Sequence, residues 1–352
     1  MRVRMMKRSL IALCLAVACS GAIAKDFYVP STISHKGQMF LNENFSLDAK
    51  NKVLTPALSD IEGWKHYQHK ADDSMVETNK AIMALYKPII VKAAMAGIPV
   101  LDIKPQNWKD NGKVLVYTHG GAYTAYSAES TLSSSVPVAN DTRLRVISVD
   151  YTLAPHAKFD VITDQVIAVL EGLTKQGYKM SDIAIYGDSA GGGLAAGTVL
   201  KMRDKGLPLP AAVVLWSPWS DITETGDTYQ TLKDAEPLYR YDLLLKPSAD
   251  AYADVKDQKH PYVSPVYGDY TKPYPPTLIQ AGTKELFLSN AVRLYQAIDS
   301  NGGEAKLDVY EGMWHVFQAF AFDIPEAKLA RKKMAAFLNE KLVINDKAEV
   351  KR

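Results

Sequence analysis

IAIYGDSAGGGLAA, residues 183–196, joins a strand pattern to a helix pattern through a turn built around one serine. The apolar run from Ile183 to Tyr186 meets the glycine-rich turn, and an Ala- and Leu-rich run with helical spacing continues to Gly206. A strand that enters a helix through G-x-S-x-G forms a nucleophile elbow, in which very small residues allow a sharp turn. This pattern predicts that Ser189 stands above a sheet, with its Oγ at the N-terminus of a helix.

Further strand and helix patterns lie on both sides of this stretch. Strands that alternate with helices along the chain predict a mainly parallel, doubly wound α/β sheet. The alternation pauses at about residues 222–270, which we interpret as a cap inserted over the strand ends. The predicted strands are residues 113–118, 145–150, 211–216, 277–280 and 306–310, and the predicted helices are residues 160–175, 289–300 and 325–342.

The chain before the first of these strands has a different pattern. Residues 25–105 carry helical periodicity, and the longest helical piece runs from Asp72 to Ala96. We interpret residues 25–105 as an N-terminal cap or extension that packs on a catalytic domain at residues 106–345. His66 and His69 lie here at i, i+3 spacing, but no third ligand accompanies them, so we expect a solvated helix face rather than a metal site.

The first 24 residues have the pattern of a signal peptide. Basic residues at positions 2, 4, 7 and 8 precede an apolar run at 10–18, and Ala22-Ile23-Ala24 fits a cleavage site. The run is short for a bilayer span. We therefore expect an exported chain, periplasmic or secreted, that begins at Lys25, and we rank lipoprotein anchoring through Cys19 second.

Composition narrows the function classes. Both cysteines, Cys14 and Cys19, lie inside the predicted signal, so the processed chain has no disulfide and no thiolate chemistry. Processing also removes four of the 41 basic residues and no acidic ones, which leaves 37 against 39 and a net charge of −2. This balance gives no support for binding to nucleic acid or to an anionic membrane. No later run is long and apolar enough to span a membrane.

A second motif, HGGAY at residues 119–123, follows the predicted strand at 113–118. Acyl transfer through a serine develops negative charge on the former carbonyl oxygen, and backbone N–H groups must point at that oxygen. Glycines allow the chain to approach closely. We predict an oxyanion hole made by the amides of Gly120, Gly121 and Ala190, and we expect His119 to order the loop rather than to titrate in catalysis.

A general base and an acid can be assigned by position. A serine hydroxyl is a poor nucleophile until a histidine can take its proton. In sheets built around such an elbow, the order along the chain is serine, acid, histidine. This order selects His315, which follows the predicted strand at 306–310, and favours Glu285, which lies 30 residues before it. Asp308 is the other nearby acid.

Four motifs together resemble one known family. HGGAY at 119–123, DYTLAP at 150–155, GDSAGG at 187–192 and GMWH at 312–315 are similar to the hormone-sensitive-lipase-like group of α/β-hydrolases, the bacterial carboxylesterases. The resemblance covers about residues 113–342. It implies an α/β-hydrolase fold with an eight-stranded sheet, a helical cap made from the N-terminus and an insertion, and hydrolysis of small carboxylic esters with no cofactor and no metal.

The chain departs from that family in three places. Ala122 replaces the third glycine of the HGGG motif, and HAKFD at residues 156–160 replaces the usual Glu-His-Pro-Phe-Pro. Glu285 occupies a position where the family often has aspartate. The oxyanion donors are expected from the first two glycines, so these changes do not exclude activity.

The expected function is a serine carboxylesterase that hydrolyses small, short-acyl esters through an acyl-enzyme, with Ser189, Glu285 and His315 as its triad. A non-catalytic ligand binder on the same fold, or a peptidase or acyltransferase with the same triad, are the alternatives, because a triad does not determine the leaving group. Tyr123, Tyr126 and Trp219 are candidate substrate-binding residues by position alone. The acyl length, the alcohol and the oligomeric state stay open.

Overall fold

The structure is a computed structural model that describes residues 28–46, 49–52 and 54–344. The predicted signal peptide, its cleavage site and both cysteines lie outside the described residues, so the expectation of export stays a prediction. Within the described residues no helix is both long enough and apolar enough to cross a bilayer.

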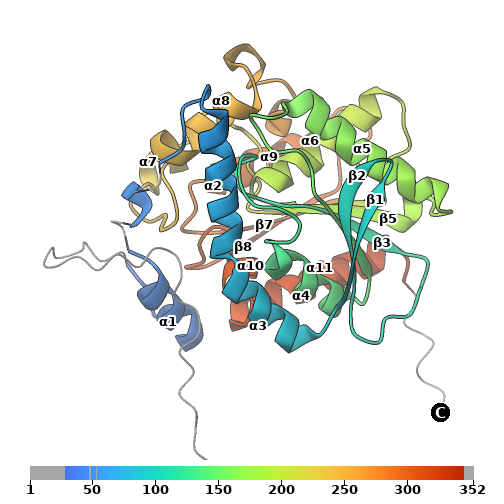
Figure 1. The fold of residues 1–352 in the computed structure, drawn as a ribbon, viewed down its shortest axis with the longest axis horizontal. Coiled ribbons are helices and arrows are strands. Elements are labelled where there is room, and N and C mark those ends of the chain that lie inside the picture. Colours follow the sequence, from blue (N-terminus) through green and yellow to red (C-terminus); the bar gives the residue numbers. More distant parts are fainter. Residues whose placement is uncertain (1–27, 47–48, 53, 345–352) are drawn as a thin grey trace, which may run out of the picture.

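The strands of the described chain form a single eight-stranded sheet (Figure 1). The strand order is β1-β2-β4-β3-β5-β6-β7-β8; β2 is antiparallel to β1 and β4, and the other neighbouring strands are parallel. The predicted α/β-hydrolase fold with a mainly parallel sheet is therefore confirmed. The strands are β1 Ile89–Met95, β2 Ile98–Lys104, β3 Val114–Thr118, β4 Arg145–Val149, β5 Ile183–Asp188, β6 Ala212–Trp216, β7 Thr277–Gly282 and β8 Ala305–Tyr310.

Helices cover both faces of the sheet (Figure 1). One apolar core lies between the sheet and α5, α6 and α9, and a second lies between the sheet and α3, α4 and α11. The central strands β3, β5 and β6 are buried along their whole length, because both faces are covered. The helices are α1 His35–Asn44, α2 Ile61–Ser74, α3 Val76–Tyr86, α4 Leu132–Thr142, α5 Phe159–Lys175, α6 Ala190–Asp204, α7 Thr228–Thr231, α8 Lys246–Tyr252, α9 Leu288–Asp299, α10 Phe317–Phe320 and α11 Pro325–Lys341.

The expectation of helix throughout residues 25–105 is wrong for its last part. Helix α3 ends at Tyr86, where Lys87 takes a left-handed conformation and Pro88 follows. Residues 89–104 then form the β1–β2 hairpin, whose turn residues Ala96 and Gly97 have φ values of 49° and 82°. Two positive φ values are typical of the type I′ hairpin turn. The strand pattern was hidden because β1 is an edge strand with nearly every residue at least partly exposed, so hydrophobic and polar residues do not alternate.

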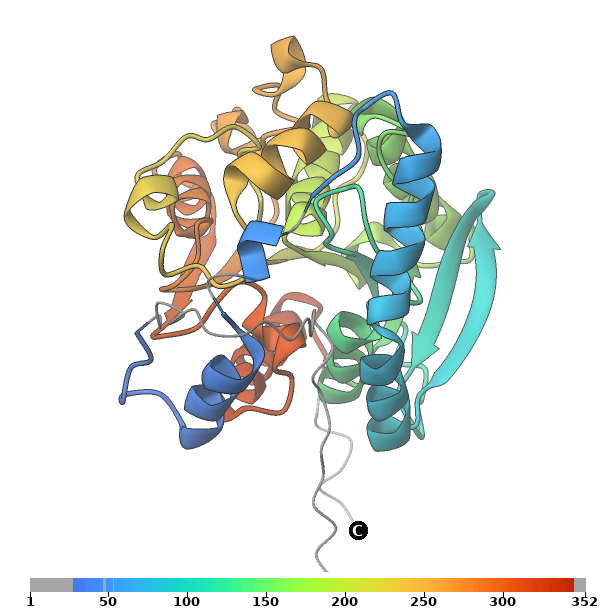
Figure 2. The same ribbon diagram turned by 60° about the vertical axis from the view of Figure 1, so that its left-hand side comes forward.

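The inserted stretch at about residues 222–270 contains only short helices, among them α7, a π-helical turn at Tyr241–Leu245, and α8. In Figure 2 these yellow and orange segments lie on the same side of the sheet as the upper half of α2. The short 3₁₀ helix η1, Ala49–Lys52, lies between them and the C-terminal segments.

The first described segment packs against the C-terminal third of the chain. Phe40 stacks on Trp314 with ring centroids 5.1 Å apart, and Phe45 meets the same indole edge-on at 5.4 Å. The Lys284 ammonium donates to the Tyr28 carbonyl oxygen at 2.5 Å.

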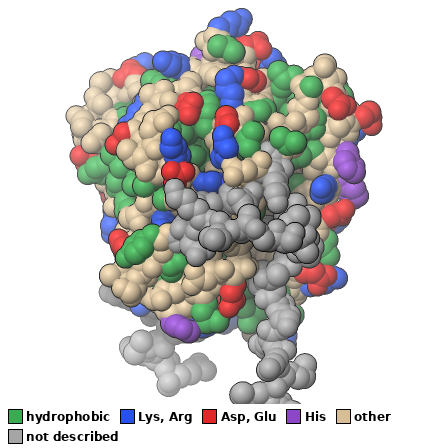
Figure 3. Space-filling view, turned by 90° about the vertical axis from the view of Figure 1, so that its left-hand side faces the viewer, with side chains coloured by type: hydrophobic (Ala, Val, Ile, Leu, Met, Phe, Trp, Pro, Cys, Tyr) green, Lys and Arg blue, Asp and Glu red, His purple; other side chains and the backbone are tan. Residues whose placement is uncertain are grey.

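On the face shown in Figure 3, basic and acidic side chains are interspersed.

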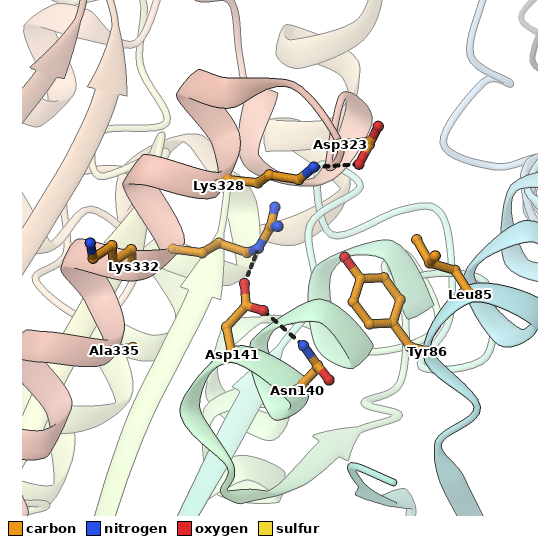
Figure 4. A pocket seen from close by; sticks show the side chains of 9 residues that line it. Leu85, Tyr86, Asn140, Asp141, Asp323, Lys328, Lys332 and Ala335 are labelled. Atoms are coloured by element: carbon orange, nitrogen blue, oxygen red, sulfur yellow. Dashed lines mark hydrogen bonds and ion pairs between the residues drawn. The ribbon is translucent and has the colours of Figure 1, made fainter.

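A buried arginine joins α11 to α4 and α10. Arg331 of α11 is only 2% exposed. Its Nε lies 2.8 Å from Asp141 Oδ2, and its Nη1 donates to the carbonyl oxygens of Gln318 and Phe322. It forms part of the wall of an open groove of about 660 Å³ among α3, α4 and α11 (Figure 4). At the rim of the same groove Lys328 pairs with Asp323, and both of those side chains are about half exposed.

We expect Arg331→Met to lower the free energy of unfolding by about 2–4 kcal/mol, because the buried carbonyl oxygens of Gln318 and Phe322 both lose their donor. Lys328→Met is the control and should cost less than about 1 kcal/mol, since its ion pair is exposed. Urea unfolding followed by circular dichroism measures both. Equal losses for the two variants would contradict the account.

Candidate active site

Ser189 lies at the turn between β5 and α6, as its motif predicted. Its φ of 54° and ψ of −125° are unusual for a residue other than glycine. A Cβ on Gly187 would lie 2.3 Å from the Gly191 carbonyl oxygen, and a Cβ on Gly191 would lie 2.1 Å from the Thr118 carbonyl oxygen. The turn therefore accepts only glycine at these two positions, and it leaves Ser189 9% exposed.

Glu285 and His315 are brought together at the ends of β7 and β8. His315 Nδ1 lies 3.2 Å from Glu285 Oε2, and both side chains are buried. When Nδ1–H donates to the carboxylate, Nε2 is left to accept a proton. Asp308, the other acid considered, lies against Lys333 at 2.7 Å instead. The acid that the sequence favoured is thus the one that contacts the histidine.

Ser217 holds this pair in place. Its hydroxyl donates to Glu285 Oε1 at 2.8 Å and accepts from the amide of Val316 at 3.0 Å. The Gly282 amide donates to the same carboxylate oxygen at 2.5 Å. The end of β6, the end of β7 and the residue after His315 therefore share one hydrogen-bond network. The sequence analysis missed Ser217, although its position directly after a predicted strand was a usable signal.

The HGGAY loop touches the elbow. A Cβ on Gly120 would lie 3.1 Å from Ser189 Cβ. The Gly120 amide also lowers the pKa of Asp188, so this amide faces the carboxyl group of that residue. Within the described residues, we find no backbone acceptor for the amides of Gly121, Ala122 and Ala190. The amides of Gly121 and Ala190 thus have no backbone acceptor, whereas that of Gly120 faces Asp188, and the oxyanion role of all three stays a prediction.

His119 orders the loop through neutral contacts. Its ring stacks on Tyr151 at 4.2 Å, and its Nδ1 lies 2.7 Å from the Gly120 carbonyl oxygen. The Tyr151 hydroxyl donates to the His119 carbonyl oxygen at 2.7 Å. Burial lowers the pKa of His119, which favours the uncharged ring. These contacts agree with the predicted ordering role.

Asp188, beside Ser189, is a buried carboxyl that the sequence analysis did not single out. Burial raises its pKa to about 6, against the opposing effects of the Tyr117 hydroxyl, which donates to it, and of His315.

The aromatic side chains around the site are mostly buried. Tyr123 and Trp219 have no exposed surface, and their rings lie 5.7 Å apart. Tyr126 is only partly buried, with a φ of 68°. A role for these three in substrate binding stays a prediction. The sequence analysis missed Tyr239 and Phe287, whose rings meet the His315 ring edge-on at 4.9 and 5.1 Å.

Left-handed backbone gathers at this site. Each such residue other than glycine costs about 1–3 kcal/mol and persists only where its surroundings hold it. Such strain is common at functional sites, and six of the eleven non-glycine residues with positive φ in the described chain lie in the segments that form this one. The residues concerned are Ala122, Tyr123, Tyr126, Ser189, Ser217 and Val316.

In the part of the chain that the structure describes, no three His, Cys, Asp or Glu side chains lie close enough together to hold a metal ion. His69 lies 3.6 Å from Asp73 on an exposed face of α2.

Comparison with known proteins gives the family. Residues 115–319 match the sequence model of the α/β-hydrolase fold. The chain is 33% identical over 230 residues to an acetyl-hydrolase of Streptomyces hygroscopicus. The aligned region covers 65% of this chain and 76% of that protein. The chain is 31% identical over 243 residues to an esterase of Acinetobacter venetianus, and the aligned region covers 69% and 79%.

Solved structures of esterases are similar to this chain in fold. The crystal structure of an esterase superposes with a TM-score of 0.82 at 27% identity, covering 93% of this chain and 98% of that one. An esterase from the bacterial hormone-sensitive lipase family gives a TM-score of 0.71 at 30% identity, covering 81% and 98%.

The chain therefore belongs to the α/β-hydrolase fold family. Within it, the relatives and the fold identify a carboxylesterase of the hormone-sensitive-lipase-like group, as the four motifs predicted. The alternative of a non-catalytic ligand binder is set aside.

We expect Ser217→Ala to lower kcat for ester hydrolysis about tenfold or more, because Glu285 and the Val316 amide both lose a partner and small displacements of catalytic groups are costly. Ser220→Ala is the matched control: Ser220 is equally buried and its hydroxyl donates to the Asn290 carbonyl oxygen at 2.8 Å. Each change should reduce stability by about 1–3 kcal/mol. Steady-state kinetics in which the two variants keep the same kcat would contradict the positioning role of Ser217.

We expect Asp188→Asn to change how stability depends on pH. Because the pKa of Asp188 is raised to about 6, the folded protein binds a proton that the unfolded chain releases above pH 4. The stabilisation is full below the unfolded pKa and is lost as pH rises through about 6. The asparagine variant should lack this loss, so its Tm should gain on the wild type between pH 4 and 6. Parallel Tm curves across this range would refute the assignment.

Proposed function

We propose that this carboxylesterase hydrolyses small carboxylic esters through an acyl-enzyme, with Ser189 as nucleophile, His315 as general base and Glu285 as the acid. The observation that carries the proposal is the buried Glu285–His315 contact at 3.2 Å beside a serine held in a strained elbow. Serine activation needs a histidine whose orientation is held by a carboxylate.

Ser189 Oγ attacks the ester carbonyl carbon, and His315 Nε2 takes the hydroxyl proton. The carboxylate of Glu285 stabilises the imidazolium that forms. His315 then gives the proton to the leaving alcohol. Water repeats the sequence on the acyl-enzyme, releases the acid and restores Ser189.

The negative oxygen of each tetrahedral intermediate needs backbone donors. We assign this role to the amides of Gly121, Ala122 and Ala190, and we assign Gly120 to shaping the loop against Asp188. Loss of one such donor costs about 3–4 kcal/mol of transition-state stabilisation in serine hydrolases. Ala122 can serve here without being glycine because only its amide is used.

Short acyl groups suit the site best. Tyr123 and Trp219 are fully buried, Phe287 and Tyr239 stand against the His315 ring, and the nucleophile itself is only 9% exposed. A relative at 33% identity is an acetyl-hydrolase, which points in the same direction. The proposed substrate class is therefore small esters with short acyl chains.

The nucleophile is tested by Ser189→Ala, which should reduce kcat by at least about 10⁴-fold, because the covalent route is lost. An organophosphonate should label the wild type once per chain and leave the alanine variant unlabelled. Ser181→Ala is the control, since Ser181 lies on the exposed surface and should label as the wild type does. Ester hydrolysis retained by the Ser189→Ala variant would overturn the proposal.

The substrate class is tested by p-nitrophenyl esters of increasing acyl length. kcat/KM should be highest for acetate and butyrate and should fall for longer chains, because the enclosed site has little exposed surface at the nucleophile. A maximum at acyl chains of ten carbons or more would contradict the assignment.

A further inference from the structure

A buried carboxyl that the reaction does not use lies next to the proposed acid. Glu236, in the inserted cap, has no exposed surface. Its Oε1 accepts from the Leu238 amide at 3.0 Å, and its Oε2 accepts from the Leu286 amide at 3.4 Å. Leu286 directly follows Glu285 in the chain, so the second contact reaches the backbone that carries the acid.

The same cap segment also reaches the proposed base. Tyr239 lies three residues after Glu236, and its ring meets the His315 ring at 4.9 Å with an interplanar angle of 90°. Such edge-to-face contacts between rings are favourable. The short turn at residues 236–239 therefore contacts the acid loop at one end and the histidine ring at the other.

A buried lysine holds this turn from the N-terminal side. Lys50 of η1 is 5% exposed, and its ammonium donates to the carbonyl oxygens of Lys233 at 2.5 Å and of Glu236 at 2.7 Å. Burial lowers the pKa of Lys50, while the negative charge of Glu236 acts in the opposite direction. Figure 2 shows η1 between the cap insertion and the C-terminal segments.

We propose that Glu236 is a positioning residue for ester hydrolysis: it holds the Glu285 loop through the Leu286 amide and presents Tyr239 to His315, while Lys50 holds it in place. This inference rests on the catalytic roles proposed above for Glu285 and His315. It makes the cap and the N-terminal segment part of the support of the catalytic groups, in addition to whatever they contribute to substrate binding.

The buried carboxyl at this position needs a structural reason. Burial raises the pKa of Glu236 to about 8, while the amides of Leu238 and Leu286 act in the opposite direction and favour the carboxylate. The groups that influence it or that it influences come from several elements: Lys50, Tyr239, Lys284 and Glu285. A packed apolar side chain would fill the space at lower cost, but only an acceptor with two oxygens can hold the Leu238 and Leu286 amides together.

Glu236→Gln is the sharpest test. Glutamine keeps the volume, but its Nε2 cannot accept from an amide N–H. Above pH 8, where the Glu236 carboxyl is ionised and both oxygens accept, one of the two amides therefore loses its partner in the variant without a cavity. We expect kcat to fall about tenfold or more, within the roughly 10²-fold that a 1 Å misplacement can cause, with KM little changed. The rate of Ser189 labelling by an organophosphonate should fall in parallel.

Lys50→Met should show the same pattern, and Lys201→Met is its matched control. Lys201 of α6 is 6% exposed, and its ammonium donates to the Asp160 carbonyl oxygen at 2.8 Å and to Thr163 Oγ1 at 2.9 Å, both on α5. It also pairs with the half-exposed Asp164 at 2.8 Å. The control should lose comparable stability and keep the kcat of the wild type.

A spectroscopic measurement separates this inference from the reaction itself. The proton shared by His315 Nδ1 and Glu285 should give a far-downfield ¹H resonance in the wild type. This resonance should shift or disappear in Glu236→Gln and Lys50→Met, and it should be unchanged in Lys201→Met.

Two results would overturn the proposal: a Glu236→Gln variant with wild-type kcat and an unchanged resonance, or equal kcat losses in Lys50→Met and Lys201→Met. Failure of the proposed reaction would look different, because Ser189→Ala would then keep its activity whatever happened at Glu236.

Discussion

The hydrogen bond between His315 Nδ1 and the Glu285 carboxylate is the interaction around which the C-terminal half of the molecule is arranged. A buried carboxylate is costly unless donors satisfy it. Here the Ser217 hydroxyl and the Gly282 amide supply donors from the ends of β6 and β7. The sheet brings these strand ends to one edge, so the geometry of the pair depends on the register of neighbouring strands rather than on any single loop.

The segments that surround this pair come from distant parts of the chain. Trp314, which precedes the histidine, packs between Phe40 and Phe45 of the N-terminal segment. Lys284, which precedes the acid, is bonded to the Tyr28 carbonyl oxygen. With the Glu236 turn on the cap side, Glu285 and His315 are enclosed from two directions. A mechanism that requires near-fixed positions of these groups benefits from such enclosure.

Strain and burial coincide at the other half of the site. Ser189 and Ala122 both have positive φ values, and a Cβ on Gly120 would lie 3.1 Å from Ser189 Cβ, so the elbow and the HGGAY loop are in close contact. Asp188 and Tyr117 lie beneath this turn and link β5 to β3. The neighbouring parallel strands β3 and β5 thus bring the HGGAY loop and the Ser189 turn side by side, although they lie about 70 positions apart in the chain.

Local patterns determined much of this protein. The glycines at 187 and 191 specify the elbow by sterics alone, and the chain order of strand-end residues selected His315 and Glu285 correctly as a contacting pair. The β1–β2 hairpin was not predicted because its exposed edge strand lacks the alternation of hydrophobic and polar residues that identifies a strand. A different reason explains why the roles of Ser217, Glu236, Tyr239 and Lys50 were not predicted. No motif in the sequence around any of them marks it as part of the site. Their contacts join residues tens to hundreds of positions apart, and only the packing of the cap and the N-terminal segment onto the sheet creates them.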